Sequence, residues 1–377
     1  MAVQIEQVRS KKDLRTFIQF QNDLYKGNPW FVPKIALDEA ATLDPKKNPA
    51  YEFSEAALYL AYKDGKLAGR VAAIVNHRAN ERWNHKEVRF GWIDFIDDKE
   101  VSKALLDKVM EFGRAKGMET IVGPLGFTDF DAEGMLVDGF DQMCTMALIY
   151  NYPYYQEHLE SFGFVKEVDW IEYMIHIPQG VPPRIARVAG IVRDRYGLNV
   201  RKITRREVKK EKLGQKIFDL VNECYHDLYN FTPLPAAMID KYVDTYLGLL
   251  DLNYVTLLEK DGKLVGFGII MPSITRALQK SGGKLFPLGW YYLLRSMYFK
   301  YEPNVEMLLV GVKPEYKGGL AMLFDEFIPL ANKAGFTYAE TNAELESNSA
   351  MQNPWDLFEK DVTKRRRVYQ KSLKIGE

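Results

Sequence analysis

The chain has 377 residues, 47% of them hydrophobic and 27% charged, which is enough material for two globular domains. Lys plus Arg and Asp plus Glu both number 51, so the balance excludes a global attraction to nucleic acid or to an anionic membrane. Without an apolar signal core or a membrane-spanning apolar run, the sequence predicts a cytoplasmic protein with no membrane partner. Cys144 and Cys224 lack metal-ligand spacing, so we expect buried thiols and no metal site.

The first half is predicted to mix strands and helices. Two alternating runs, Ala56–Tyr62 and Leu67–Asn76, flank a Lys-Asp-Gly-Lys turn and indicate a hairpin. An amphipathic helix is predicted over Lys99–Lys116, ending at Gly117. The other predicted elements are strands at Val3–Val8, Phe90–Ile96, Thr120–Pro124 and Val165–Ile175, helices at Lys11–Tyr25 and Tyr154–Phe162, and irregular chain over Gly27–Pro49.

A break between Ile177 and Pro183, rich in proline and glycine, divides the chain into predicted domains 1–177 and 184–377. The second half repeats the order of the first. Its predicted strands are Leu198–Ile203, Tyr254–Glu259, Lys263–Pro272, Val305–Val312, Thr337–Asn342 and Arg365–Leu373, and its predicted helices are Lys210–Tyr229, Ala236–Leu250, Leu320–Ala334 and Ala350–Lys360. Each half therefore predicts a mixed α/β domain, whose mostly antiparallel sheet is flanked by helices.

The run Leu308–Ala321, LLVGVKPEYKGGLA, ends a predicted strand and begins a predicted helix. It resembles the cofactor loop of the Gcn5-related N-acyltransferase (GNAT) family, Arg/Gln-x-x-Gly-x-Gly/Ala. Gly319 and Ala321 take the two small positions, and Tyr316 stands where Arg or Gln is usual. Amides at a helix N-terminus cradle anions, and glycine allows a close approach of the backbone. The plainer alternative is a strand–turn–helix whose glycines serve only the turn.

The resemblance implies two fused GNAT-like domains with acyl-CoA as the co-substrate. Asn348 fits the Asn that the family often places at the end of the next strand, although it is equally a helix N-cap. The cofactor-binding residues implied in this way are Val310, Val312, Tyr316, Lys317, Gly318, Gly319, Leu320, Ala321 and Asn348.

The first half departs from the family at the cofactor loop. Phe95–Val101 has no glycine and three acids there, so we expect it to repel a pyrophosphate. Tyr154 and Tyr155 resemble the later GNAT helix, in which a Tyr protonates the departing thiolate, and the alternative is core packing. In the second half Trp355 and Phe358 occupy that position, and neither is an acid.

A general base is needed to take a proton from an attacking ammonium. Glu306, near the start of the cofactor strand, and Glu340, on the next strand, are the candidates, with a structural or solvated charge as the alternative. Phe286, Trp290 and Tyr291 lie in an aromatic insertion before the cofactor strand. We expect them to line a substrate pocket, or else to belong to a helix that packs the two halves together.

The sequence therefore predicts an acyl-CoA-dependent N-acyltransferase, with acetyl as the expected acyl group and a small-molecule amine or peptide as the acceptor. One alternative is a non-catalytic acyl-CoA-binding or scaffold protein. Another is an aminoacyl-tRNA-dependent transferase, because the peptidoglycan-bridge transferases also resemble tandem GNAT-like halves. The balanced charge argues against the tRNA-dependent alternative and for no nucleic-acid partner.

Overall fold

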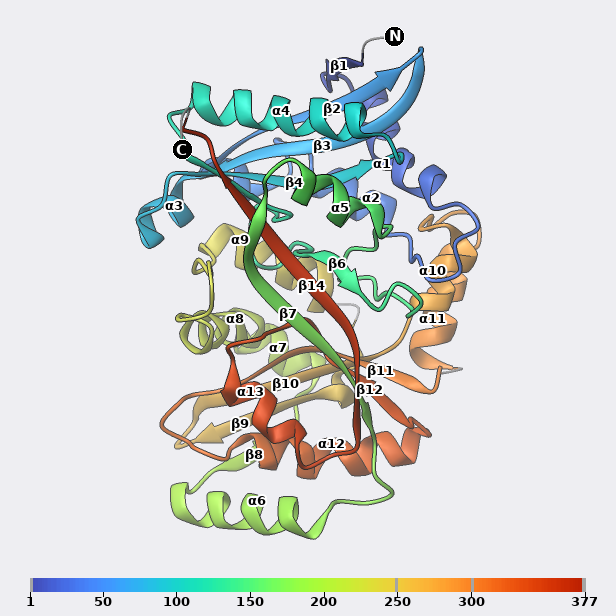
Figure 1. Cartoon of the computed structure of the whole chain (residues 1–377). Coiled ribbons are helices and arrows are strands. Elements are labelled where there is room, and N and C mark those ends of the chain that lie inside the picture. The colour runs from blue at the N-terminus through green and yellow to red at the C-terminus, as the bar shows by residue number, and fades with distance from the viewer. Residues whose placement is uncertain (1–2, 248–249, 300–301, 375–377) are drawn as a thin grey trace. The chain divides into compact units, whose positions relative to one another are not determined.

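The computed structural model describes residues 3–247, 250–299 and 302–374 (Figure 1). By their contacts the residues form two compact units. Unit 1 comprises Met1–Ile171, Thr275–Trp290 and Lys364–Glu377, and unit 2 comprises Glu172–Ile274 and Tyr291–Thr363. The division at 177 and 184 remains a prediction, since each unit also takes segments from beyond that break. No helix among the described residues is long and apolar enough to cross a bilayer.

Unit 1 is built on a mixed sheet with strand order β1-β2-β3-β4-β5-β14. These strands are β1 (Gln4–Gln7), β2 (Ser54–Lys63), β3 (Lys66–Asn76), β4 (Glu87–Phe95), β5 (Thr120–Gly123) and β14 (Lys360–Ser372). β4 and β5 run parallel, whereas β1/β2, β2/β3, β3/β4 and β5/β14 run antiparallel, so the predicted hairpin and mixed sheet are confirmed. The strand β6 (Met135–Asp138) pairs with β14, and β7 (Val165–His176) has residues in both units.

Helices cover both faces of the unit 1 sheet. A Cβ at Gly69 of β3 would meet Leu105 of α4 (Lys99–Ala115), and the guanidinium of the next residue, Arg70, lies over Phe17 of α1 (Lys11–Leu24). Since neighbouring residues of a strand point to opposite faces, α4 and α1 lie on opposite sides. The remaining helices that begin in this unit are α2 (Ala36–Thr42), α3 (His77–Trp83), α5 (Tyr154–Ser161), α10 (Thr275–Ser281) and α11 (Gly289–Tyr298), with a 3-10 turn at Pro49–Glu52.

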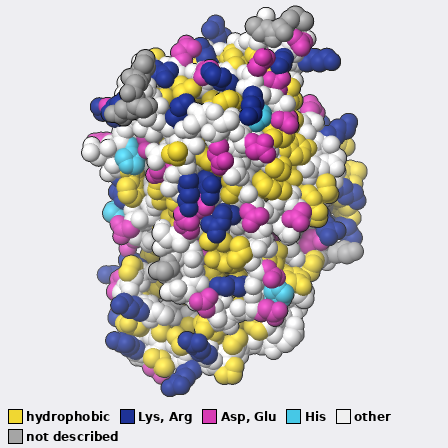
Figure 2. All heavy atoms as spheres, viewed as in Figure 1, with side chains coloured by type: hydrophobic (Ala, Val, Ile, Leu, Met, Phe, Trp, Pro, Cys, Tyr) yellow, Lys and Arg dark blue, Asp and Glu magenta, His cyan; other side chains and the backbone are white. Residues whose placement is uncertain are grey.

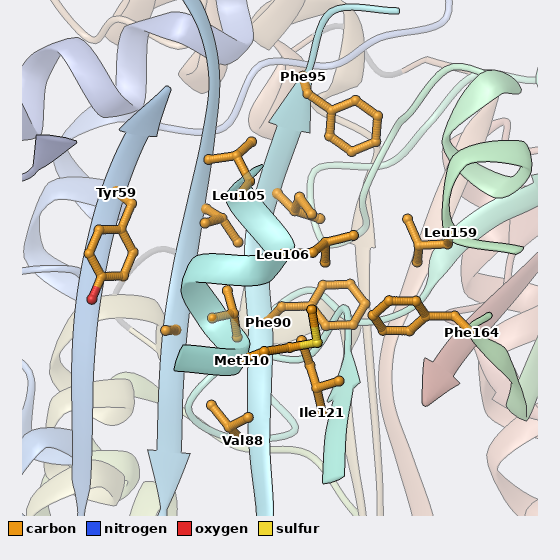
Figure 3. Packing of buried hydrophobic residues seen from close by; sticks show 14 of the residues in the cluster. Tyr59, Val88, Phe90, Phe95, Leu105, Leu106, Met110, Ile121, Leu159 and Phe164 are labelled. Atoms are coloured by element: carbon orange, nitrogen blue, oxygen red, sulfur yellow. The ribbon is translucent and has the colours of Figure 1, made fainter. Parts of the chain in front are cut away.

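The core of unit 1 fills the space between α4 and the sheet. Leu105, Leu106 and Met110 of α4 point toward the strands, where they pack with Phe90 of β4 and Phe164 (Figure 3). Each is buried. Burying a Leu, Phe or Met side chain contributes about 1.5–3 kcal/mol, so this face of α4 holds the helix to the sheet.

Unit 2 repeats the plan with strand order β7-β12-β11-β10-β9-β8. Its strands are β8 (Asn199–Arg201), β9 (Val255–Lys260), β10 (Lys263–Pro272), β11 (Asn304–Val312) and β12 (Tyr338–Glu340), and β13 (Glu344–Leu345) pairs with β7. Its helices are α6 (Pro183–Tyr196), α7 (Arg205–Lys210), α8 (Leu213–Cys224), α9 (Ala236–Tyr242), α12 (Leu320–Ala334) and α13 (Ser349–Trp355), with a π-helical turn at Val243–Leu247 and a 3-10 turn at Leu252–Tyr254.

The helices of unit 2 also lie on both faces of its sheet. A Cβ at Gly268 of β10 would meet Phe327 and Leu323 of α12, whereas a Cβ at Gly311 of β11 would meet Cys224 of α8. Gly268 pairs with Val310, the neighbour of Gly311, so the two glycines face opposite sides. The helix α6 packs in turn on α12.

Candidate active site

The site begins where two parallel strands of unit 2 separate. β11 pairs with β12 only through Asn304–Glu306, opposite Tyr338–Glu340. On its other edge β11 pairs with β10 up to Val312, with a bulge at Leu308. Residues 307–312 therefore leave one edge of β11 without a β12 partner in the described chain, and their amides and carbonyls need other partners. Such an opening between strands can receive an extended ligand.

A tyrosine hydroxyl meets this open edge. The Tyr225 hydroxyl donates to the Val310 carbonyl oxygen at 3.0 Å, and the Val310 amide donates to the same hydroxyl at 3.4 Å. Tyr225 directly follows α8, so the helix fixes its position. Burial raises the pKa of the Tyr225 hydroxyl well above its usual value, which keeps the proton in place at neutral pH.

Glu344 is the carboxylate that burial shifts toward neutrality. Burial raises its pKa to about 7, and a hydrogen bond from Trp355 and the charge of Lys360 only partly oppose the rise. The Trp355 indole Nε1 donates to both carboxylate oxygens, at 2.9 and 3.0 Å. The charge of Glu344 contributes to the raised pKa of Tyr225, so the two groups interact. A carboxylate with a pKa near the working pH can accept a proton from an amine.

The loop after β11 presents open amides at the start of α12. Gly319, Ala321 and Met322 donate to the carbonyls of Tyr316, Gly318 and Gly319, which closes a tight turn. Across residues 313–322, all of them described, four non-proline amides donate to no carbonyl, and these belong to Glu315, Lys317, Gly318 and Leu320. α12 is 15 residues long and its first turn carries no side-chain cap. Open amides at a long uncapped helix favour an anion.

The glycines of this loop serve close packing. Gly318 has φ +83°, and a Cβ there would meet Val192 of α6 at 3.1 Å. At Gly319 a Cβ would lie 2.7 Å from Val312, the last residue of β11. The loop is therefore held against β11, and only glycine fits at 319 without a shift. The open amides of this closely packed loop suit the pyrophosphate of an acyl-CoA.

Two other residues predicted to bind the cofactor, Tyr316 and Asn348, have contacts or positions that the structure describes. Tyr316 packs edge-on against Tyr196 at 5.5 Å between ring centroids, and the Lys260 ammonium lies 5.6 Å from its ring. Asn348 occupies the N-cap position of α13, as its alternative role predicted, but its side chain makes no cap hydrogen bond. The roles of Val310, Val312, Lys317, Leu320 and Asn348 toward a cofactor remain predictions.

The two predicted carboxylates, Glu306 and Glu340, are brought together. They are register partners on the parallel pair β11/β12, so their side chains leave the same face at the point where the strands separate. Both are buried, and the Ser273 hydroxyl donates to Glu306 Oε1 at 2.8 Å. Their role as a general base remains a prediction.

An apolar pocket lies on the other face of the same strands. Val305 and Met307 of β11, Ala339 of β12 and Ile270 of β10 form its sheet wall. The remaining walls come from α12, α13 and neighbouring chain, through Ile175, Ile177, Pro178, Phe324, Phe327, Ile328, Ala331, Trp355 and Phe358. Its empty volume is about 450 Å³ including the mouth. Because every lining residue is apolar, the pocket suits a hydrocarbon group.

Trp355 connects this pocket to Glu344. The residue is buried and lines the pocket, while its indole N–H donates to Glu344. The sequence predicted no acid at this position, in agreement with this role as donor to a carboxylate. Glu344 and Tyr225 were not predicted as site residues. They come from different parts of the chain and carry no motif, so only the fold reveals them.

Unit 1 has the same strand arrangement, and tyrosine hydroxyls meet the separated part of its strand as Tyr225 does in unit 2. β4 pairs with β5 only through Glu87–Arg89, so its second half separates as in unit 2. Here the Tyr155 hydroxyl accepts from the Phe95 amide at 3.0 Å, and the Tyr154 hydroxyl donates to the Phe95 carbonyl at 2.6 Å. Tyr155 also shares a 2.8 Å hydrogen bond with Tyr25. Both tyrosines are thus hydrogen-bonded within their own unit, as the core-packing alternative expects, and their role as an acid remains a prediction.

The helix that follows β4 is capped by an acid. Asp98 accepts from the amides of Glu100 and Val101 at the start of α4, and it pairs with Lys63. The protein's own carboxylate therefore occupies the place of an anion. The aromatic residues predicted to line a substrate pocket, Phe286, Trp290 and Tyr291, are exposed and are not among the residues that line the apolar pocket of unit 2.

The comparisons with known proteins bear on the fold. No family model matches the chain. A solved tandem GNAT protein from the clavulanic acid biosynthesis pathway superposes with a TM-score of 0.54 at 14% identity, covering 100% of both chains. The chain has the tandem GNAT fold. A GCN5-related N-acetyltransferase from Sphaerobacter thermophilus agrees, with a TM-score of 0.52 at 12% identity over 100% of this chain and 97% of that one.

Two curated proteins match over nearly the full length. Protein YghO of Escherichia coli is 26% identical over 97% of this chain and 94% of its own. The protein named bacterial ceramide synthase of Caulobacter vibrioides is 25% identical over 97% of this chain and 96% of its own.

Proposed function

We propose that the chain is an N-acyltransferase that transfers a long acyl group from acyl-CoA to the amine of a long-chain amino alcohol, with its active site in unit 2. The apolar pocket carries this proposal, because walls that are apolar throughout suit a hydrocarbon chain. The reaction class agrees with the tandem GNAT fold. The acceptor is suggested by the name of the ceramide synthase relative, since a ceramide is a fatty amide of such an amino alcohol.

The residues present fit an acyl-CoA. The open amides of Lys317, Gly318 and Leu320 would hold its phosphates, and the separation of β11 from β12 would admit its extended arm. The thioester supplies an activated acyl carbon. The chain's residues then hold and orient this group beside the amine, which lowers the entropic part of the barrier.

Proton transfer would be carried by Glu344 and assisted by Tyr225. The amine nitrogen forms a bond to the acyl carbon as the carbon–sulfur bond breaks. Glu344, whose pKa is raised to about 7, accepts the proton that the nitrogen loses. The Tyr225 hydroxyl, whose raised pKa preserves its proton, would donate a hydrogen bond to the departing thiolate, and the proton taken up by Glu344 then passes to that thiolate, which leaves as the thiol. Glu306 and Glu340 remain the alternative bases.

The test is the preference for acyl chain length. Ala331 lines the pocket from α12, and Ala331→Phe would fill it. With sphinganine as acceptor, we expect the wild type to release thiol faster from palmitoyl-CoA than from acetyl-CoA. The variant should lose about tenfold or more with palmitoyl-CoA and keep its acetyl-CoA rate.

Ala334→Phe is the matched control, on the same helix but not lining the pocket. It should leave both rates unchanged. Equal loss with both donors would show that the pocket does not hold the acyl chain. No thiol release with either donor, together with no acyl-CoA binding, would overturn the proposed function.

A further inference from the structure

The segment around α11 differs in charge from the rest of the molecule. Residues 275–299 contain four basic side chains, Arg276, Lys280, Lys284 and Arg295, and no Asp or Glu. All four are exposed. Over the chain as a whole the charges balance, and basic and acidic side chains are interspersed on the face seen in Figure 2. The excess of positive charge is thus local.

The same segment exposes large apolar side chains. Of the twelve large hydrophobic residues that are exposed in the described chain, six lie between 286 and 299. These are Phe286 (74%), Leu288 (54%), Trp290 (47%), Tyr291 (49%), Leu294 (42%) and Phe299 (83%). Single exposed hydrophobic residues are normal, but six within one short stretch mark an interaction surface.

The helix α11 is apolar on two faces. Leu293 and Met297, one turn apart, are buried and hold the helix to the protein. Trp290, Tyr291 and Leu294 point outward beside Arg295. A helix that faces only water carries polar residues on its outer side, so this outer face is built for an apolar partner.

We propose that α11 and the turn before it bind the surface of a membrane containing anionic phospholipids. Trp and Tyr favour the boundary between acyl chains and headgroups, and Lys and Arg beside them attract anionic headgroups. An amphipathic helix with this composition lies in the plane of the interface. A second copy of the chain fits less well, because a symmetric contact through this face would bring its basic residues together.

The test is co-sedimentation of the full chain with phospholipid vesicles. We expect binding to vesicles of phosphatidylcholine mixed with phosphatidylglycerol, and much weaker binding to phosphatidylcholine alone or in high salt. Trp290→Ser/Leu294→Ser should abolish the binding. Lys284→Glu/Arg295→Glu should lower the partition coefficient about twentyfold or more, at about fivefold for each basic charge removed.

The matched control is Leu37→Ser. Leu37 is 61% exposed, but it lies on α2 beside Asp38 and Glu39, so its replacement should not change vesicle binding. Circular dichroism should show that all variants remain folded. The proposal would be overturned if the α11 variants bound vesicles as well as the wild type does. It would also be overturned if the wild type self-associated in the absence of vesicles and the α11 variants did not. The assay uses no acyl-CoA, so its result is independent of the proposed function.

Discussion

At the scale of single residues, the raised pKa of Glu344 predicts how activity depends on pH. Below pH 7 its carboxyl is protonated in the folded protein and cannot accept a proton, and above pH 7 it is ionised. We therefore expect kcat/KM to rise with pH and level off above an apparent pKa of about 7. Glu344→Gln should lower kcat by about a hundredfold and remove this rise.

Glu346→Gln, an exposed position two residues further along, is the matched control and should keep the wild-type profile. Glu306→Gln tests the alternative base. If Glu306→Gln removes the rise in kcat/KM and Glu344→Gln does not, the base lies on β11.

A second residue-scale prediction concerns the buried ion pair of unit 1. Arg70 and Asp94 are each 1% exposed and lie 2.7 Å apart, and the Tyr25 hydroxyl donates to Asp94 at 2.9 Å. Asp94→Asn would leave the guanidinium buried without its counter-charge. We expect the free energy of unfolding to fall by about 3–5 kcal/mol, measured by chemical denaturation.

Asp107→Asn is the control, because Asp107 forms an exposed pair with Lys103 on α4. Its cost should be less than about 1 kcal/mol. A similar small loss for Asp94→Asn would mean that water or another group compensates Arg70.

At the scale of secondary-structure elements, local signals predicted most of the fold. The turn at residues 63–66 between alternating strands predicted the β2/β3 hairpin, and the observed pairing of Lys63 with Lys66 confirms it. The Gly27–Pro49 region was predicted to be irregular, yet it contains α2, a short helix whose terminus has no side-chain cap. The predicted helix Lys210–Tyr229 was wrong in its bounds, because Lys212 adopts a left-handed conformation and separates α7 from α8.

The candidate site was only partly predictable, because some of its residues carry a local sequence pattern and others meet only through the fold. The loop around Gly319 has a sequence pattern, and the structure shows it between β11 and α12 as expected. Tyr225 and Glu344 are far apart in sequence, and their interaction arises from the packing of α8 beside the open edge of β11. The shift in the pKa of Glu344 comes from burial, which no spacing of residue types specifies.

The loop itself gives a prediction at this scale. A methyl group at Gly319 would lie 2.7 Å from Val312, so Gly319→Ala must displace the loop from β11. We expect the affinity for palmitoyl-CoA to fall about tenfold or more in calorimetry, because the amides no longer converge on the phosphates. Gly190→Ala on α6 meets nothing within 4 Å and should bind like the wild type. Unchanged affinity of Gly319→Ala would place the cofactor elsewhere.

At the scale of the whole molecule, the two units share one strand arrangement but differ in the residues that meet an anion at the helix after the separated strand. In each unit two parallel strands pair over three residues and then separate, which supports the repeat expected from the sequence. The exchange of segments between the units was not predicted, because local patterns do not specify which sheet a terminal strand joins. The expectation of no membrane partner, drawn from the balanced net charge, stays a prediction; a count over the whole chain does not report the local excess of basic residues around α11, on which the membrane proposal rests.

This asymmetry predicts one acyl-CoA per chain. In unit 2 the helix after the separated strand begins with open amides, whereas in unit 1 Asp98 caps the equivalent helix. A carboxylate that already accepts from these amides repels a phosphate, whereas free amides attract one. Calorimetry with palmitoyl-CoA should therefore give a stoichiometry of about one. Gly319→Ala should weaken that single event, whereas Asp98→Asn, which removes the charge in unit 1, should leave it intact. A second binding event in the wild type, or loss of binding in Asp98→Asn, would show that unit 1 also takes part in holding the co-substrate.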